Sequence, residues 1–283
     1  MSKVRAKKNL TTLICLIAVI CVAIFSGYFL GNLITNKHFI ADKFANLTTA
    51  MLRDDISKIN IASVDPDDVS PAIAYQVAEK VMKESTHYEA RGRTLVDTSA
   101  GVKQESSTID RRNGDDLYFG FTTYSSVMKI SMQSHFNIGG DVNIQNGTPT
   151  DETVEHVNWS NSIDEYSWEG YKEFFGRYAN ESSCFLVSTK TVRESSSVEK
   201  DGDLYKFTVV LDPELSTIGY VKQIGNTAGV NPSLVEFKYA TLTVWLDEDF
   251  RFVKQQKSES YALPYAGIHL TLMLESDLVY EIE

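Results

Sequence analysis

The spacing of apolar residues divides the chain into three stretches with different predicted structures. Residues 10–34 are uncharged and mostly apolar, long enough as a helix to cross the ~30 Å hydrocarbon core of a membrane. From residue 71 to about residue 85, Ile73, Val77 and Val81 recur every four positions, which predicts a one-sided helix. Ser70 followed by Pro71 suits the start of this helix. After His87 the period falls to about two, which indicates β-strands.

Alternation of polar and apolar residues predicts an antiparallel sheet in the first half of this third stretch. Asn113-Gly114 is a strong hairpin signal between two of the strands. Many polar residues in these strands indicate a sheet with one wet face. Residues 139–163 have a weak pattern, and we expect them to leave the sheet. The four expected strands lie near residues 88–97, 102–111, 116–124 and 127–137.

The second half of the third stretch predicts two helices and five more strands. Leu270, Leu272 and Leu274 fall on one face of the last strand, so the final strands form a meander with an apolar side. The expected helices cover Asp164–Tyr178 and Asp212 to about Ile224, and the strands cover residues 184–198, 203–211, 235–246, 250–261 and 268–282.

The net charge of −11 is divided unevenly along the 283 residues. Four basic residues stand in the first eight positions, which leaves 23 basic and 38 acidic residues, a net of −15, for the rest. Such acidity argues against a nucleic-acid binder, which would show a basic patch or stripe. Positive charge before an apolar span stays in the cytoplasm. We therefore expect a cytoplasmic tip (1–9), a transmembrane signal anchor (10–35), a stalk (36–69) and an extracytoplasmic β-rich domain (70–283).

The apolar stretch has two competing interpretations, a cleaved signal peptide and a lipid anchor. Ser26-Gly27 is the nearest cleavage site, but Phe25 is too large for the −3 position, and the apolar run exceeds the 7–15 residues of a signal peptide. A lipid-modified Cys15 or Cys21 would follow a small residue, and here each follows isoleucine. The sequence favours an uncleaved anchor.

No pattern of catalytic or metal-binding residues emerges. The chain has no His-Glu-x-x-His or Gly-x-Ser-x-Gly motif. Cys184 is the single cysteine after the apolar stretch, and we interpret it as a buried, inert thiol in a strand. No cofactor and no enzymatic activity are predicted. The five histidines are too far apart along the chain for a local metal pair: His38, His87, His135, His156 and His269.

The order of the elements resembles the lipoprotein-carrier superfamily of bacterial periplasmic carriers and mycobacterial lipid-binding lipoproteins. The resemblance covers residues 70–283 and depends on the helix from Pro71, the Asn113-Gly114 hairpin, the helix from Asp212-Pro213 and the Val235–Ile282 meander. It implies an α+β fold in which a large curved antiparallel sheet, a half-barrel, wraps around two or three covering helices. It also implies a cavity for acyl chains or other apolar ligands.

Two functions follow from these observations. The first is a membrane-anchored binding domain that holds a lipid or other apolar ligand in the half-barrel. The alternative is a non-enzymatic cell-envelope scaffold whose sheet face binds another envelope protein. The aromatic residues between positions 159 and 178 would either fill the core or line a cavity mouth or partner surface, and the sequence favours the core because aromatic clusters are ordinary core material. The candidate residues for the cavity or partner surface are Trp159, Tyr166, Trp168, Tyr171, Phe174, Phe175, Leu242, Val244, Leu270 and Leu272.

Overall fold

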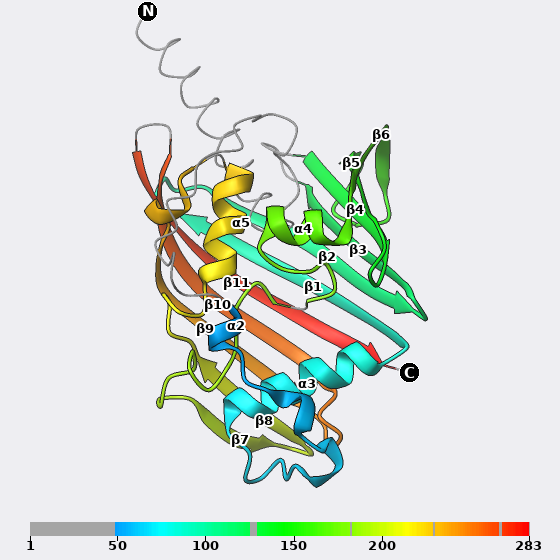
Figure 1. Cartoon of the computed structure of the whole chain (residues 1–283). Coiled ribbons are helices and arrows are strands. Elements are labelled where there is room, and N and C mark those ends of the chain that lie inside the picture. The colour runs from blue at the N-terminus through cyan, green and yellow to red at the C-terminus, as the bar shows by residue number, and fades with distance from the viewer. Residues whose placement is uncertain (1–48, 125–128, 182, 229, 266–267, 283) are drawn as a thin grey trace, which may run out of the picture.

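The computed structural model describes residues 49–124, 129–181, 183–228, 230–265 and 268–282. These residues form one antiparallel sheet of 11 strands, with helices packed against it (Figure 1). The strands are β1 His87–Thr98, β2 Lys103–Asn113, β3 Asp116–Tyr124, β4 Lys129–Asn137, β5 Val142–Pro149, β6 Val157–Tyr166, β7 Ser197–Asp201, β8 Leu204–Val210, β9 Glu236–Leu246, β10 Phe252–Tyr265 and β11 Ile268–Ile282.

The order of strands in the sheet is β6-β5-β4-β3-β2-β1-β11-β10-β9-β8-β7. Strands β1–β6 pair in sequence order, and so do strands β7–β11; β1 pairs with β11 and joins the two halves, which leaves β6 and β7 at opposite edges of the sheet. The predicted hairpin at Asn113-Gly114 is confirmed, with Gly114 at a φ of 64°. The prediction of an α+β domain with a large antiparallel sheet is therefore confirmed.

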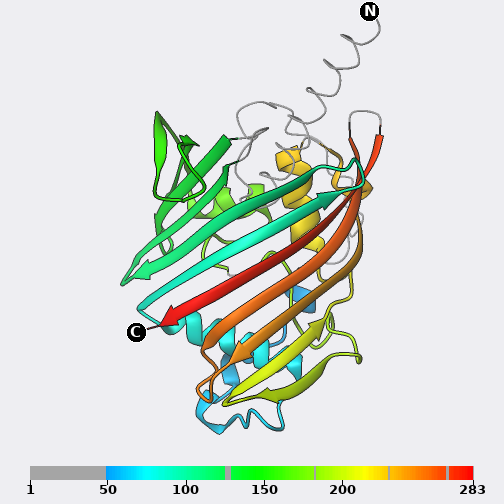
Figure 2. The same cartoon turned by 180° about the vertical axis from the view of Figure 1, so that it is seen from behind.

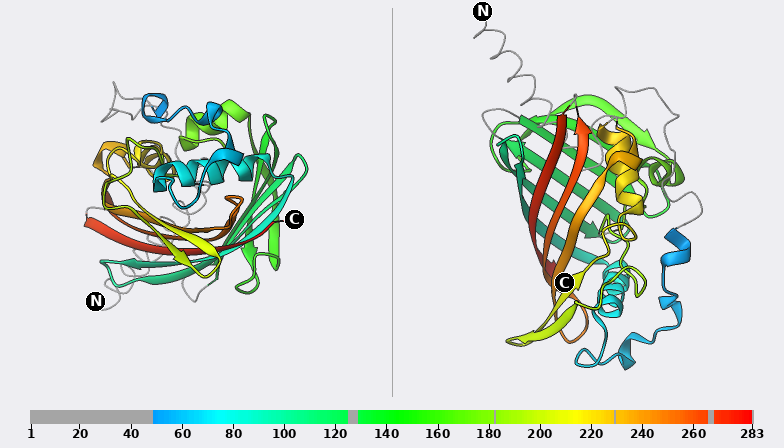
Figure 3. Two further views of the ribbon diagram at one scale, coloured as in Figure 1. Left: turned by 90° about the horizontal axis from the view of Figure 1, so that it is seen from below. Right: turned by 90° about the vertical axis from the view of Figure 1, so that its left-hand side faces the viewer.

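The sheet is curved, and its helices lie on the concave face (Figure 3). These helices are α2 Thr49–Leu52, α3 Pro71–Glu84, α4 Trp168–Phe175 and α5 Ile218–Ala228. Strands β1–β4 and β9–β11 cross the opposite, convex face without helical cover (Figure 2). Ion pairs occupy part of that face, where Arg91 and Arg111 both bind Glu89.

Helix α3 begins as its sequence predicts. The Ser70 side chain accepts a hydrogen bond from the Ile73 amide, and Pro71 occupies the first turn. One face of the helix is buried, including Tyr75 and Ala78 at 0% exposure. Its last turn meets β2, where Arg112 Nη1 donates to the Lys83 carbonyl over 2.7 Å. Helical carbonyls at this end have no partner within the helix, so Arg112 fixes α3 on the sheet.

The concave face holds two separate apolar cores. The main core lies over β8–β11 and contains side chains from α3 and α5, among them Val77 and Ile224. The second core lies over β3–β5 and is covered by α4 through Tyr171 and Phe175.

Two boundaries predicted from sequence are wrong. Residues 139–163 do not leave the sheet, because they form β5 and most of β6. Strand β6 lies at the edge of the sheet, and most of its side chains are exposed, so its sequence lacks apolar alternation. Residues 184–196 are irregular rather than a strand, apart from an isolated bridge between Val192 and Leu211.

The segment before α3 folds onto the domain. Residues 49–69, which we assigned to the stalk, contribute Ile59, Ile61 and Val64 to the edge of the main core. Within the described part of the chain, no helix has both the length and the apolarity of a membrane span. The predicted anchor at residues 10–35 lies outside the described residues.

Candidate functional site

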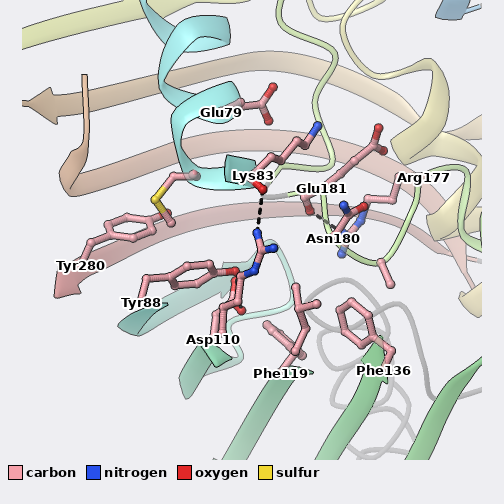
Figure 4. Close-up of a pocket in the computed structure, with 14 residues that line it drawn as sticks. Glu79, Lys83, Tyr88, Asp110, Phe119, Phe136, Arg177, Asn180, Glu181 and Tyr280 are labelled. Carbon is pink, nitrogen blue, oxygen red and sulfur yellow. Dashed lines mark hydrogen bonds between the residues drawn. The ribbon is translucent and has the colours of Figure 1, made fainter. Parts of the chain in front are cut away.

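A pocket opens on the concave face where the two cores meet (Figure 4). We call it the seam pocket; its volume is about 80 Å³. It lies between the last turns of α3, strands β1–β4, the end of β11 and residues 177–181. Its walls are formed by Glu79, Met82, Lys83, Tyr88, Asp110, Arg112, Leu117, Phe119, Phe136, Arg177, Ala179, Asn180, Glu181 and Tyr280.

Alternation along the strands sets the chemistry of this pocket. On β3 and β4, Leu117, Phe119 and Phe136 point to the concave face and supply an apolar wall. On β2, every inward position is polar: Gln104, Ser106, Thr108, Asp110 and Arg112. The pocket is therefore apolar along one side and charged along the other.

Asp110 is the carboxylate on the pocket floor. It is half-buried and faces Tyr88, whose phenol donates a hydrogen bond to Asp110 Oδ1 over 3.3 Å. Loss of water raises the pKa of Asp110 to about 6, although the Tyr88 hydrogen bond and the charge of Arg177 oppose that rise. Burial and the Asp110 charge also raise the pKa of Tyr88, as they do for Tyr280.

The two arginines of the seam pocket hold the surrounding backbone. Arg112 donates to the carbonyls of Lys83 and Gly114 over 2.7 and 2.9 Å. Arg177 donates to the Glu181 carbonyl over 2.7 Å, which shapes the loop that forms one rim. Sequence reasoning did not identify these arginines or Asp110. The usable signal was charge at inward positions of an alternating strand.

A groove beside α3 adjoins the seam pocket. The groove has a volume of about 290 Å³ and shares Glu79, Lys83, Arg177 and Glu181 with the seam pocket. Cys184, Phe185 and Leu186 line its far end. Cys184 is half-buried in an irregular segment, with its thiol 3.5 Å from Gln223 Oε1, so its predicted place in a strand is wrong.

Residues 53–57, which we call the strap, form one side of the groove. Asp54 accepts hydrogen bonds from the Thr189 amide and hydroxyl, each over 2.7 Å, and from Gln76 Nε2 over 2.8 Å. Arg53 forms an ion pair of 2.7 Å with Glu181 on the rim. Partial burial raises the pKa of Asp54, but the hydrogen bonds from Thr189 and Gln76 outweigh it and leave the pKa lowered.

The four aliphatic candidates from the sequence lie inside the main core. Leu242, Val244, Leu270 and Leu272 have 0% exposure. Side chains of α3, α5 and residues 185–187 pack in the same core. Among the described residues, the concave face over β8–β11 is packed with core side chains, and the assignment of these four residues to a cavity or partner surface stays a prediction.

The aromatic candidates divide between the two faces of the sheet. Tyr171 and Phe175 are buried in the second core, with Tyr166, Trp168 and Phe174 packed against it. Trp159 pairs with Gly147 on β5, and Gly147 pairs with Ser131 on the convex face. Trp159 therefore lies on the side opposite the other five. Leu117 and Phe136 of the seam pocket belong to this second core, and the centroids of the Phe136 and Trp168 rings lie 6.2 Å apart.

Among the described residues, no group of three or more histidine, cysteine, aspartate or glutamate side chains is placed to hold a metal ion. His87, His135, His156 and His269 lie on strands or turns. His38 lies outside the described residues.

Comparisons with known proteins return structural matches alone. No family model matches the chain, and no curated protein does. A LolA superfamily protein from Nitrosomonas europaea matches at 9% identity and a TM-score of 0.26, covering 75% of this chain and 92% of that one. Rv2717c from M. tuberculosis matches at 10% identity and a TM-score of 0.23, covering 76% and 99%. The first match names the superfamily whose element order the sequence resembles.

Proposed function

We propose that this protein is a membrane-anchored, extracytoplasmic binding protein that holds an amphipathic ligand in the seam pocket and the adjoining groove. The proposal depends on the lining of these two adjoining spaces. An apolar wall from Leu117, Phe119 and Phe136 faces charged side chains across the seam pocket, and the groove extends the space along α3. A ligand with an apolar body and a polar end fits such a lining.

The size of the two spaces limits the ligand. A water molecule needs roughly 10–15 Å³ of comparable space, so the seam pocket, at about 80 Å³, receives a small group. The groove, at about 290 Å³, has room for a short chain or ring beside that group. The described side chains over β8–β11 pack into the main core, so the proposal places the ligand at the seam rather than over these strands.

The proposed anchor gives the site its location. Residues 10–35 would hold the protein on the outer side of a membrane, and the strap begins 18 residues after that span. The groove bordered by the strap would then lie near the membrane surface, where amphipathic molecules concentrate. Binding needs no catalytic group, and we propose no reaction.

Mass spectrometry of molecules that copurify with the full-length protein tests this function. Ala179 lines the seam pocket and is half-buried, so Ala179→Trp should fill the pocket and remove the bound molecule. Ala100→Trp is the matched control, because Ala100 is exposed in the turn between β1 and β2. A copurified amphiphile retained equally by both variants would contradict the proposed site.

An observation on the convex face favours a second function, binding of an envelope protein by the sheet. Leu95, Met273 and Tyr239 are 46%, 46% and 43% exposed. The register places them near one another, because Met273 pairs with Asp97 and Ser260, and Ser260 pairs with Tyr239. Apolar side chains gathered on a surface often mark a protein contact. Substitution Met273→Asp should abolish such a contact while leaving the seam pocket unchanged.

A further inference from the structure

We infer that the seam pocket selects an organic cation, a primary or quaternary ammonium group, and that Asp110 is its partner. This inference rests on the proposed function and names the class of ligand. It follows from what surrounds the Asp110 carboxylate (Figure 4).

The carboxylate of Asp110 has unused hydrogen-bonding capacity. An ionised carboxylate accepts about four hydrogen bonds, yet among the described residues Asp110 accepts one, from Tyr88 over 3.3 Å. No ion pair within 4.0 Å joins Asp110 to a described basic side chain. A half-buried carboxylate with so few partners costs stability, and a cationic ligand would supply the missing partner.

Aromatic rings provide the second part of the site. Tyr88, Phe119, Phe136 and Tyr280 line the pocket that contains Asp110. Ring faces attract ammonium groups, by about 0.5–2 kcal/mol for each good contact. A carboxylate and several rings in one small pocket therefore suit a cation with attached carbon atoms better than a hydrated metal ion.

The basic side chains nearby do not create an anion site of equal quality. Arg112 and Arg177 donate to backbone carbonyls, as described above. Lys83 is exposed and belongs to the rim. The three basic side chains of the lining are balanced by Glu79, Asp110 and Glu181, so net charge favours neither sign. Glu181 is paired with Arg53, whereas Asp110 accepts one hydrogen bond within the described part of the chain, from Tyr88, so Asp110 is the group that selects a cation.

The groups that face Asp110 set its response to pH. They are Tyr88 on β1, Arg112 on β2, Tyr280 on β11, Arg177 after α4, and Glu79 and Lys83 on α3. The pKa of the Asp110 carboxyl group is raised to about 6. Its ionisation can therefore be followed in ordinary buffers. Cation binding needs the ionised carboxylate, so affinity should rise between pH 5 and pH 7.5.

Calorimetric titration of the full-length protein in nanodiscs tests the inference, with empty nanodiscs subtracted. The probes are hexylamine, hexyltrimethylammonium, hexanoate and hexanol, which share a chain and differ in the polar end. We expect the two cations to bind at least tenfold more tightly than hexanoate. Asp110→Asn should weaken cation binding by about ten- to a hundredfold, as expected for loss of a charge-assisted contact, and leave hexanol within twofold. Asp97→Asn, on the convex face of β1, is the control.

The outcomes separate the inference from the proposed function. If hexanoate or hexanol binds as tightly as the cations, and Ala179→Trp abolishes that binding, the selectivity for cations is overturned while the seam pocket remains the binding site. Cation binding unaffected by Asp110→Asn in a folded protein would also overturn the inference. Absence of binding by all four probes would overturn it too, while molecules that copurify with the wild type and are lost in Ala179→Trp would still support the proposed function.

Discussion

Tyr88 on β1 and Asp110 on β2 lie on the concave face of neighbouring strands and share a hydrogen bond of 3.3 Å at the floor of the seam pocket. Burial is the main cause of the raised pKa of each group. The negative charge of Asp110 adds to the rise for Tyr88, whereas the hydrogen bond from Tyr88 opposes the rise for Asp110. The pair therefore places an ionisable group with an altered pKa in the seam pocket, between the two cores.

Replacement of Asp110 by asparagine should stabilise the protein at neutral pH. The pKa of Asp110 is raised to about 6 from the usual 3.8, so folding favours its protonated form. The resulting penalty on the folded state grows as pH rises from about 4 to 6 and stays at its full value above that. We expect Asp110→Asn to gain on the order of 1–3 kcal/mol at pH 7.5 and almost nothing at pH 3.5. Urea unfolding at both pH values measures the difference, and an equal effect at both would contradict this account of Asp110.

The strap should open when Asp54 loses its charge. Asp54 accepts hydrogen bonds from Thr189 and Gln76, and Cys184 lines the groove that the strap borders. In a Cys15→Ala/Cys21→Ala background, Asp54→Asn should raise the rate of maleimide labelling at Cys184 by about tenfold. Asp55→Asn is the control, because Asp55 is exposed and bonds to the nearby Ser57 and Lys58.

The same strap should respond to acid. The pKa of Asp54 is lowered in the folded protein, so its contribution is present above the unfolded pKa and is lost as pH falls through the folded value. Labelling of Cys184, corrected for the reactivity of a free thiol, should therefore accelerate at low pH in the wild type and not in Asp54→Asn. If neither low pH nor Asp54→Asn changes the labelling rate of Cys184, the strap does not control access to the groove.

Gly176 should be essential where α4 ends. It has a φ of 73°, and a Cβ there would lie 2.5 Å from the Gly219 carbonyl oxygen at the start of α5. Gly176→Ala therefore adds a backbone clash to the cost of a left-handed conformation, and we expect a loss of about 2–4 kcal/mol. Gly202→Ala has a similar φ of 65° with nothing within 4 Å, and should cost about 1 kcal/mol. Similar losses in urea unfolding would show that the contact between α4 and α5 is unimportant.

Truncation of Leu242 should reveal a filled core. Leu242 is 0% exposed and packs among side chains of α3 and α5, so Leu242→Ala should cost about 2–5 kcal/mol. Leu95→Ala is the matched control, because Leu95 is 46% exposed on the convex face, and should cost under about 1 kcal/mol. A small loss at Leu242, with binding of a hydrophobic dye to the wild type, would indicate an open cavity under β9 instead.

The sequence predicted the elements whose periodicity the core enforces. Helix α3 and the final meander follow their patterns closely, because each element buries the face that carries its apolar residues, such as Val77 in α3 and Leu270 and Leu272 in β11. Strand β6 was missed because an edge strand has no second neighbour and little burial to impose alternation. Residues 184–196 were assigned to a strand because Phe185 and Val187 are apolar, yet they pack into the core from an irregular segment.

The site was harder to predict than the fold. Asp110, Arg177 and Tyr280 come from β2, the loop after α4, and β11. They meet because β1 pairs with β11 and because Gly176 turns the chain after α4. Neither relationship follows from local pattern. Candidates were instead chosen for apolar character, which describes core residues such as Leu242 as well as ligand contacts.

Photo-crosslinking of a bound amphiphile tests the central claim most directly. The full-length protein in nanodiscs would be irradiated with a six-carbon alkylamine that carries a diazirine on its chain, and the labelled residues identified by peptide mass spectrometry. We predict labelling on β2–β4 around Leu117 and Phe119 and on residues 177–181, lost in Ala179→Trp and retained in Ala100→Trp. Labelling centred on Leu95 and Met273 of the convex face, or unchanged by Ala179→Trp, would contradict a ligand site at the seam.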